Sequence, residues 1–334
     1  MTEAKSILRD IKAKKYKPVY FLGGEEPYFI DVISDYIQKN VLEEHERDFN
    51  QTILYGKETN AGEILSVAKR FPMMSEYQVI IVKEAQSIGK ELDKLEAYLK
   101  NPLSTTLLVF CSKYKKLDKR KKVSKIIAET GILFESKKLY ENQVGDFITQ
   151  VLGNKGYKIE PKASLMLTEF LGTDLSKINN ELQKLQIIIP KGNTISAHDI
   201  EVNIGISKDF NVFELNNAIG NKDQLKAYKI CNYFIENPKE KPLVVTISLL
   251  FSFFSKVMQY HGLGDKSSGN AASKLKISTF FVKDYANAAR NYPMKKVSYI
   301  IEKIRDADVK SKGVGASQFG QNDILRELLV QIFS

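Results

Sequence analysis

The chain has 334 residues, of which 43% are hydrophobic and 27% charged, and its formal net charge is +10 at pH 7. These values exclude a wholly disordered chain and a single small module, and the length leaves room for two or three domains. The surplus of positive charge favours approach to polyanions such as DNA, RNA or anionic lipid.

The first 140 residues alternate helical and strand-like segments. Residues 1–18 form a charged amphipathic segment without the apolar core of a signal peptide, so we expect no export signal. Five short apolar runs follow, PVYFLGG, FNQTILYG, YQVIIVKEA, TTLLVFCS and GILFESK. Such alternation is typical of a parallel sheet with helices on both faces. The sequence therefore predicts an α/β domain over residues 1–140.

From residue 141 the strand signals stop, and apolar residues recur at helical spacing in segments that end at glycine or proline. We expect an all-α remainder, with a small helical domain over residues 141–207 and a larger one over residues 208–334. Two segments rich in glycine and serine, 261–275 and 310–321, are predicted to be loops between helices. The last helix places one apolar stripe over Ile324, Leu325, Leu328, Leu329, Ile332 and Phe333.

The longest apolar run, residues 243–254, is shorter than the ~20 residues that a membrane-spanning helix needs. We expect it to be a buried helix. The two cysteines, Cys111 and Cys231, form no CxxC motif. They exclude a disulfide framework and a cysteine-based zinc site, and they favour a reducing cytoplasm.

The first predicted strand ends at a glycine turn, where many proteins hold a nucleotide phosphate. A working P-loop reads GxxxxGK[ST], because its lysine balances the phosphate charge and its hydroxyl holds Mg²⁺. Here Gly23 and Gly24 are followed by Glu25, Glu26 and Pro27. The carboxylates repel a triphosphate at the helix N-terminus, and proline suits a first helical turn. We expect a degenerate P-loop that caps a helix and binds no nucleotide.

The sequence gives equally little support for other catalytic groups. The strand that carries the Walker-B acids in ATPases ends here in Lys83 and Glu84, and a lysine there would oppose Mg²⁺. His45, His198 and His261 have no spaced carboxylate or cysteine companions, so solvated or core histidines are expected. The sequence therefore predicts no catalytic residue, no metal site and no cofactor.

Residues 71–76, FPMMSE, are apolar at a junction where a polar loop is usual. Pro72 biases Phe71 away from helical dihedrals, so the preceding helix should end there. Met73 and Met74 follow directly. They are either core filler or an exposed anchor for a pocket on a partner, and periodicity does not decide between the two.

A basic run over residues 113–122 contains seven basic side chains and one acid, Asp118. It is either a solvated loop or a contact to phosphate or to another subunit. The candidate contact residues are Lys115, Lys116, Lys119, Arg120, Lys121 and Lys122. Towards the C-terminus, Tyr285, Tyr292 and Tyr299 lie among further lysines. They suit base stacking, but core positions in helices explain them better.

Several of these segments carry a family likeness. KPVYFLGGEEPYFID, AKRFPMMSEYQVIIVKEA and LLVFCSKYKKLDKRKK resemble the first domain of the delta subunit of the bacterial DNA polymerase III clamp loader. NNELQKL resembles its second domain, and FNVFELNNAIGNKD, ASKLKISTFFVKDYANAARNY and DADVKSKG its third. The likeness covers nearly the whole chain in the family's order. It implies an AAA+-like module with a lid-like second domain, followed by a helical collar.

The resemblance also implies a function in DNA replication. In that family this subunit binds no ATP, joins other loader subunits in a hetero-pentamer, and binds the sliding clamp (beta) and opens its ring. The family's apolar clamp-binding pair falls on Met73 and Met74, with Phe71 and Pro72 beside it, which favours the exposed anchor. Primed DNA is reached through the assembly, the location is cytoplasmic, and no membrane is involved. Polymerase (nucleotidyltransferase) activity belongs to the holoenzyme.

Two other functions remain open from the residues. A divergent AAA+ ATPase would bind labelled ATP, which the missing lysine and hydroxyl argue against. A stand-alone basic DNA-binding protein would show steep salt dependence without partners. The sequence contains no helix-turn-helix, zinc or single-strand-binding motif that would favour it.

Overall fold

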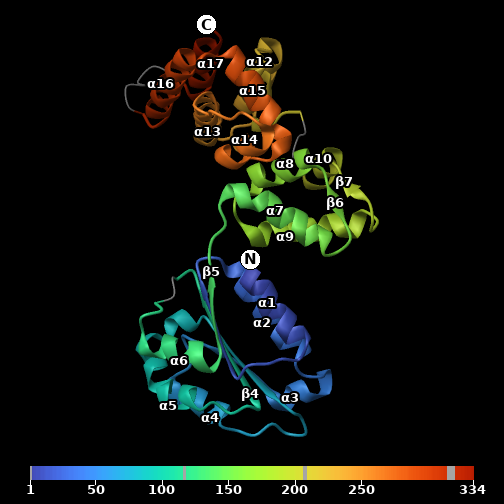
Figure 1. Ribbon diagram of the computed structural model, residues 1–334, viewed down its shortest axis with the longest axis vertical. Helices are drawn as coiled ribbons and strands as arrows, with labels where there is room; N and C mark the ends of the chain where they lie inside the picture. Colours follow the sequence, from blue (N-terminus) through green and yellow to red (C-terminus); the bar gives the residue numbers. More distant parts are fainter. Residues whose placement is uncertain (1, 116–117, 206–208, 314–319) are drawn as a thin grey trace. The chain divides into compact units, whose positions relative to one another are not determined.

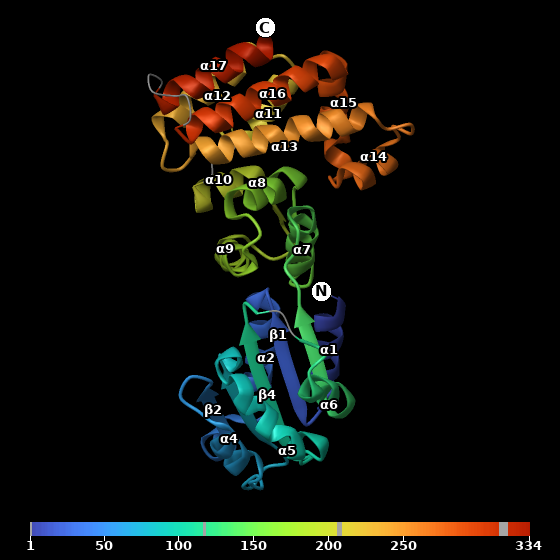
Figure 2. The ribbon, with the colours of Figure 1, turned by 90° about the vertical axis from the view of Figure 1, so that its left-hand side faces the viewer.

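The computed structural model describes residues 2–115, 118–205, 209–313 and 320–334. The chain divides into two compact units, Met1–Leu139 and Tyr140–Ser334 (Figures 1 and 2). Lys116 and the predicted boundary at residues 207 and 208 lie outside the described residues, so that boundary stays a prediction.

The first unit is built on a five-stranded sheet in the order β2–β3–β4–β1–β5. Every neighbouring pair is parallel. The strands are β1 (Val19–Gly24), β2 (Gln51–Tyr55), β3 (Gln78–Lys83), β4 (Thr106–Lys113) and β5 (Ile132–Ser136). Each of the five apolar runs in the sequence therefore forms a strand, as predicted.

Helices cover both faces of this sheet. Figure 1 shows α1 and α2 on one face and α4, α5 and α6 on the other. The α-helices are α1 (Thr2–Lys12), α2 (Pro27–Asn40), α3 (Arg47–Asn50), α4 (Ala61–Ala68), α5 (Glu96–Lys100) and α6 (Lys122–Thr130). The 3₁₀ helices are η1 (Glu44–Glu46), η2 (Ala85–Ser87) and η3 (Gly89–Leu95). The predicted α/β class is confirmed.

Side-chain alternation places the core of this unit. Val19, Phe21, Ile80, Leu108 and Phe110 belong to one buried cluster with residues of α4, α5 and α6. The residues between them, such as Leu22 and Val109, are also fully buried. Successive side chains of a strand point to opposite faces, and both faces of this parallel sheet are covered by helices.

Because all five strands run the same way, the sheet has an amino-end edge and a carboxyl-end edge. The segment before β3 and the helix before β2, which hold residues 71–76 and α3, lie at the amino-end edge. Gly23, Gly24 and Lys113 end their strands at the opposite edge. The six residues of β3 span ~20 Å. The two regions that the sequence singled out are therefore at opposite ends of the sheet.

The second unit begins with four helices and a short parallel strand pair. The helices are α7 (Glu141–Gly153), α8 (Pro161–Leu171), α9 (Leu175–Ile188) and α10 (Ala197–Ile204). The pair consists of β6 (Lys158–Ile159) and β7 (Thr194–Ile195). The helices are as predicted, but the pair was not, because two residues are too few to produce an alternating pattern.

The remaining helices form one bundle with a continuous apolar core. They are α11 (Val212–Gly220), α12 (Gln224–Glu236), α13 (Leu243–His261), α14 (Ser268–Leu275), η4 (Thr279–Phe281), α15 (Val282–Asn291), α16 (Met294–Ser311) and α17 (Gln321–Phe333). Figure 2 shows α13, α16 and α17 running across this bundle. The predicted stripe on α17 is buried at Ile324, Leu325, Leu328, Leu329 and Ile332, with Phe333 partly buried.

Helix α13 is long and apolar enough, by length and composition, to cross a membrane, and 39% of that stretch is buried inside the protein. Leu250, Phe254 and Val257 have no exposed surface and belong to the core of the bundle. Val244 and Val245, on another face, are about half exposed. The predicted buried helix is therefore present, with one face in the core.

The predicted loop over residues 261–275 is wrong in its second half, because α14 occupies Ser268–Leu275. Ala271, Ala272 and Leu275 are buried and give this helix its apolar face. Polar residues order the turn that precedes this helix. Asp265 accepts hydrogen bonds from the N–H and the hydroxyl of Ser267, the residue before the first helical position. A helix whose core contacts are mostly alanine produces little hydrophobic periodicity.

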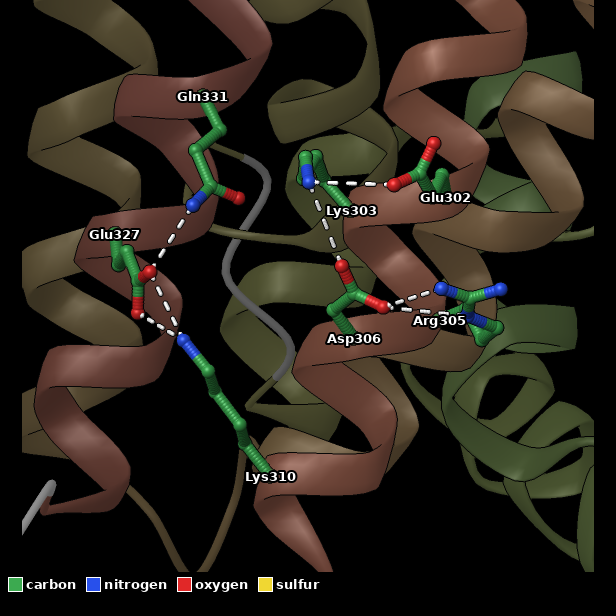
Figure 3. Close-up of polar contacts among 7 residues, drawn as sticks. All are labelled: Glu302, Lys303, Arg305, Asp306, Lys310, Glu327 and Gln331. Atoms are coloured by element: carbon green, nitrogen blue, oxygen red, sulfur yellow. Dashed lines mark hydrogen bonds and ion pairs between the residues drawn. The ribbon is translucent and has the colours of Figure 1, made fainter. Parts of the chain in front are cut away.

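Polar contacts join α16 and α17 outside the bundle core (Figure 3). The Lys310 ammonium lies 2.9 and 2.7 Å from the two carboxylate oxygens of Glu327, which also accepts from Gln331. On α16, Asp306 pairs with Lys303 and Arg305. These groups are partly exposed, so each pair adds little to stability.

Candidate functional site

Residues 71–74 form an exposed apolar projection between α4 and β3. Phe71 and Met73 are 76% and 62% exposed, Met74 is fully exposed, and Pro72 is half-buried. The core-filler interpretation of the two methionines is therefore wrong. Exposed large apolar groups of this kind, rimmed by polar residues, mark interaction sites. Binding of a clamp by these residues stays a prediction.

The backbone of this projection is held by Asn50, at the end of α3. The Asn50 Nδ2 group donates to the Met73 carbonyl at 2.9 Å, and Asn50 Oδ1 accepts from the Met73 N–H at 2.7 Å. Asn50 is only 4% exposed, and its Nδ2 also donates to the Glu46 carbonyl. Met74 then adopts a left-handed conformation with φ of +52°. The side chains are exposed, but the backbone beneath them is fixed.

A second buried amide fixes the start of the projection. Gln78 is 5% exposed, and its Nε2 donates to the Arg70 carbonyl at 2.5 Å and to the Thr106 hydroxyl at 2.8 Å. The Tyr98 and Thr106 hydroxyls donate to the Ala68 carbonyl at 3.1 and 3.2 Å. Carbonyls at the end of a helix have no intrahelical partner. These donors satisfy them at α4 and end the helix at a fixed point.

Electrostatics also tie the projection to the segment before α3. The Glu43 N–H, 2.8 Å from Glu46 Oε2, and then the Ser75 hydroxyl hold the pKa of Glu46 below its usual value. Glu46 therefore stays ionised at neutral pH. Ser75 follows the methionine pair directly, so Met73 and Ser75 are both bonded to the segment that holds Glu46 and Asn50.

The glycine turn at the end of β1 is built differently from a phosphate-binding loop. Gly23 and Gly24 are the last residues of β1 and are paired within the sheet. The Glu26 N–H donates to the Ser136 carbonyl at 3.2 Å, and the Ser136 hydroxyl donates to the Glu26 carbonyl at 2.6 Å. A Cβ on Gly24 would lie 2.0 Å from the Ser136 carbonyl oxygen. The turn is closed against the end of β5.

Glu26 caps α2 as predicted. Its carboxylate accepts from the Tyr28 N–H at 3.0 Å, Pro27 is the first helical residue, and Glu26 is 3% exposed. Two backbone N–H groups that a phosphate would need, those of Glu26 and Tyr28, are thus bonded within the protein. Glu25 is exposed.

Two further polar contacts lie at this edge. Lys113, at the end of β4, lies 2.7 Å from the Asp31 carboxylate of α2. Burial by itself lowers the pKa of Lys113, but the hydrogen bond and charge of Asp31 outweigh it, so the pKa is raised. Glu84, with φ of +53°, accepts a hydrogen bond from Gln86. Lys83 and Glu84 do not form the acidic pair that holds Mg²⁺ in ATPases.

The basic run is largely ion-paired. Lys119 lies 2.8 Å from Glu135, Arg120 lies 3.0 Å from Asp118, and Lys122 lies 2.7 Å from Glu96. Lys115 and Lys121 are exposed, and within the described part of the chain they form no ion pair. The run is therefore less positive than its sequence indicates.

The remaining candidates are placed as ordinary structural residues. Within the described residues, no group of three His, Cys, Asp or Glu side chains has the arrangement to hold a metal ion. Burial raises the pKa of the Cys111 and Cys231 thiols to about 12, so both stay protonated. Tyr292 is 1% exposed in the core of the bundle, and Tyr299 lies under Lys296 and Lys303.

One exposed side chain beside the projection was not predicted from the sequence. Phe49 is 72% exposed and directly precedes Asn50 on α3. The sequence offered one signal for it, a phenylalanine between polar residues just before a strand. Its place beside the projection depends on the contact between Asn50 and Met73, which are 23 residues apart in the chain.

The family of the chain follows from comparison with known sequences. The sequence model described as DNA polymerase III, delta subunit, matches residues 20–137, and the model of that subunit's C-terminal domain matches residues 209–330. Together these ranges cover well over half of the chain. The chain belongs to the DNA polymerase III delta-subunit family. The resemblance stated from the sequence is confirmed.

Members of the delta-subunit family match along most of the chain. The DNA polymerase III subunit delta of Bacillus subtilis is 27% identical over 338 residues, covering 98% of this chain and 94% of that protein. The probable subunit delta of Aquifex aeolicus is 25% identical, covering 65% and 63%. Among solved structures, the DNA clamp loader delta protein of Bacillus subtilis covers 99% of each chain at 24% identity, with a TM-score of 0.54. The fold is therefore that of a delta subunit.

Proposed function

We propose that this delta subunit binds the sliding clamp (beta) through Phe71, Pro72, Met73 and Met74. The observation that carries the proposal is the fully exposed Met74 side chain on a backbone fixed by buried Asn50. Preorganisation matters because ordering a loop on binding costs affinity. A rigid apolar anchor with a polar rim is the usual energetic centre of a protein interface.

Binding of this kind opens the ring without chemistry in this chain. A clamp is a closed ring in equilibrium with an opened form, and a ligand that fits the opened form better shifts that equilibrium. The subunit acts within a hetero-pentamer of clamp-loader subunits in the cytoplasm, and primed DNA is reached through that assembly. Sister subunits supply the ATP-driven step, and polymerase activity belongs to the holoenzyme.

The subunit itself has no ATPase activity and needs no cofactor. Bonding of the Glu26 and Tyr28 N–H groups within the protein supports this, as does the Ser136 carbonyl packed against Gly24. Equilibrium binding of labelled ATP to the full chain tests it. We expect no saturable binding up to millimolar ATP; saturable binding would instead favour the divergent ATPase.

The test of clamp binding replaces Met73 and Met74 together by serine. We expect the affinity for the clamp of the same organism to fall by more than about 100-fold, since two central anchors are lost. Met294→Ser, which removes a methionine that is 49% exposed on α16, is the matched control and should leave the affinity unchanged. Release of the clamp from nicked circular DNA should fall in parallel. Unchanged affinity in the double variant contradicts the proposal.

A further inference from the structure

The described residues of the first unit expose six large apolar side chains, and they are not spread evenly. These are Phe49, Tyr55, Phe71, Met73, Met74 and Tyr114. Four of the six precede β2 or β3, whereas Tyr55 and Tyr114 lie at the ends of β2 and β4. Phe49, Phe71, Met73 and Met74 therefore gather at the amino-end edge of the sheet, and we call this group the edge patch.

The Asn50 side chain places Phe49 near the methionines. β2 and β3 pair in parallel, with Gln51 opposite Val79, so the segments that precede them lie at the same edge of the sheet. The Asn50 side chain bonds directly to the Met73 backbone. Since consecutive Cα atoms are ~3.8 Å apart, the Cα of Phe49 lies within about 10 Å of the Met73 nitrogen.

Phe49 has no evident structural reason to be apolar. It is 72% exposed and is not among the buried residues of the unit. Its neighbour Asp48 is exposed, as are Lys69, Arg70 and Glu76 around the projection. The edge patch thus has an apolar centre and a charged rim of both signs, which is the composition of a protein interface.

From these observations we infer that Phe49 is a second anchor for the sliding clamp, and that Asn50 is a positioning residue that holds it in register with the methionines. This inference rests on the proposed function, because the occupant is the same clamp. Two anchors joined by a buried amide bind as one rigid surface, so neither has to be ordered when the clamp docks.

The test measures clamp affinity for the full-length protein with Phe49→Ser, Phe49→Leu and Tyr114→Ser. We expect Phe49→Ser to weaken binding roughly tenfold and Phe49→Leu to retain most of the affinity, since an apolar anchor remains. Tyr114 is equally exposed, at 72%, but follows β4 at the opposite edge, so Tyr114→Ser should bind normally. If Phe49→Ser binds normally while the methionine variant does not, the inference fails and the proposed function stands. If neither variant weakens binding, both fail.

The role of Asn50 is tested by coupling. Asn50→Ala should weaken binding roughly tenfold in the parent but less than about threefold in the Met73→Ser, Met74→Ser background, because the methionine anchors that Asn50 holds in register with Phe49 are then gone. Equal loss in both backgrounds would contradict a positioning role, as would a lower melting temperature with unchanged affinity. If Asn50→Ala does not fold, Asn50→Asp serves in the same cycle: it keeps the acceptor for the Met73 N–H and loses the donor to the Met73 carbonyl.

Discussion

The Lys162 ammonium on α8 lies 2.7 Å from the carboxylate of Glu214 on α11. The Glu214 side chain is only 7% exposed, and its other oxygen pairs with Lys226 of α12. The ion pair between Lys162 and Glu214 therefore links the helices that precede residue 205 to the bundle that follows residue 209. Removing one partner from such a site leaves charges uncompensated, which is costly where they are buried.

This contact predicts a pH dependence of stability. Burial by itself raises the pKa of Glu214, but hydrogen bonds from Lys162 and Lys226 and their charges outweigh it, so the folded-state pKa is lowered. A lowered folded-state pKa gives stability that is present above the unfolded pKa and lost as pH falls through the folded one. Glu214→Gln should lower the free energy of unfolding by about 2 kcal/mol at pH 7.

Thermal melts of parent and Glu214→Gln between pH 3 and 8 check this. The two melting temperatures should differ most above about pH 5 and converge towards the acid end. Glu181→Gln is the matched control, because Glu181 pairs with exposed Lys184 on one helix, and it should cost under about 0.5 kcal/mol. A difference that is constant over the whole pH range would contradict the assignment.

A second prediction concerns the glycine turn. Gly24 has φ of +143° and no room for a Cβ, whereas Gly89 has φ of +59° and nothing within 4 Å. Gly24→Ala should therefore cost at least about 3 kcal/mol, from strain and from the clash with Ser136. Gly89→Ala, which adds strain alone, should cost about 1 kcal/mol. Denaturant unfolding measures both. Equal costs would mean that the contact with β5 relaxes freely.

How much of this was predictable depends on how local the signal is. The five strands and the Glu26 cap follow from short runs, because burial and capping act within a few residues. The residue pattern alone did not decide whether Met73 and Met74 are exposed, because exposure depends on which distant segments pack around residues 71–74; only the family resemblance favoured it. Asn50 was missed because its bonds to Met73 cross 23 residues of chain. Helix α14 was missed because its buried face is mostly alanine, which produces little hydrophobic periodicity.

A third prediction concerns the buried amide of Gln78. Gln78→Leu keeps the volume but removes the donor to the Arg70 carbonyl and the Thr106 hydroxyl. Because these groups then lack their hydrogen-bond donor, the free energy of unfolding should fall by about 2 kcal/mol. The start of residues 71–74 also loses its fixed point, so clamp affinity should fall several-fold. Hydrogen exchange at residues 69–75 should rise with it. Lower stability with unchanged exchange and affinity would confine Gln78 to a structural role.

The last prediction addresses the basic run. A lysine that contacts phosphate releases a counterion, so its loss reduces the salt dependence of DNA binding, by ~0.9 in the logarithmic slope for duplex DNA. The charges of Lys119 and Lys122 are compensated by Glu135 and Glu96, whereas Lys115 and Lys121 are exposed without an ion pair to any described residue. We compare two double variants, Lys115→Gln/Lys121→Gln and Lys119→Gln/Lys122→Gln. The first should reduce the salt-dependence slope for binding to primed DNA more than the second.

Titrations of primed DNA with the full chain between 50 and 300 mM salt measure the two slopes. The Lys119→Gln and Lys122→Gln substitutions should mainly lower the free energy of unfolding, by under about 1 kcal/mol for each exposed ion pair that is lost. Equal slope changes in the two double variants would mean that phosphate displaces Glu135 and Glu96 from their lysines. Slopes equal to that of the parent in both would remove DNA as the partner of this run and leave a neighbouring subunit or solvent.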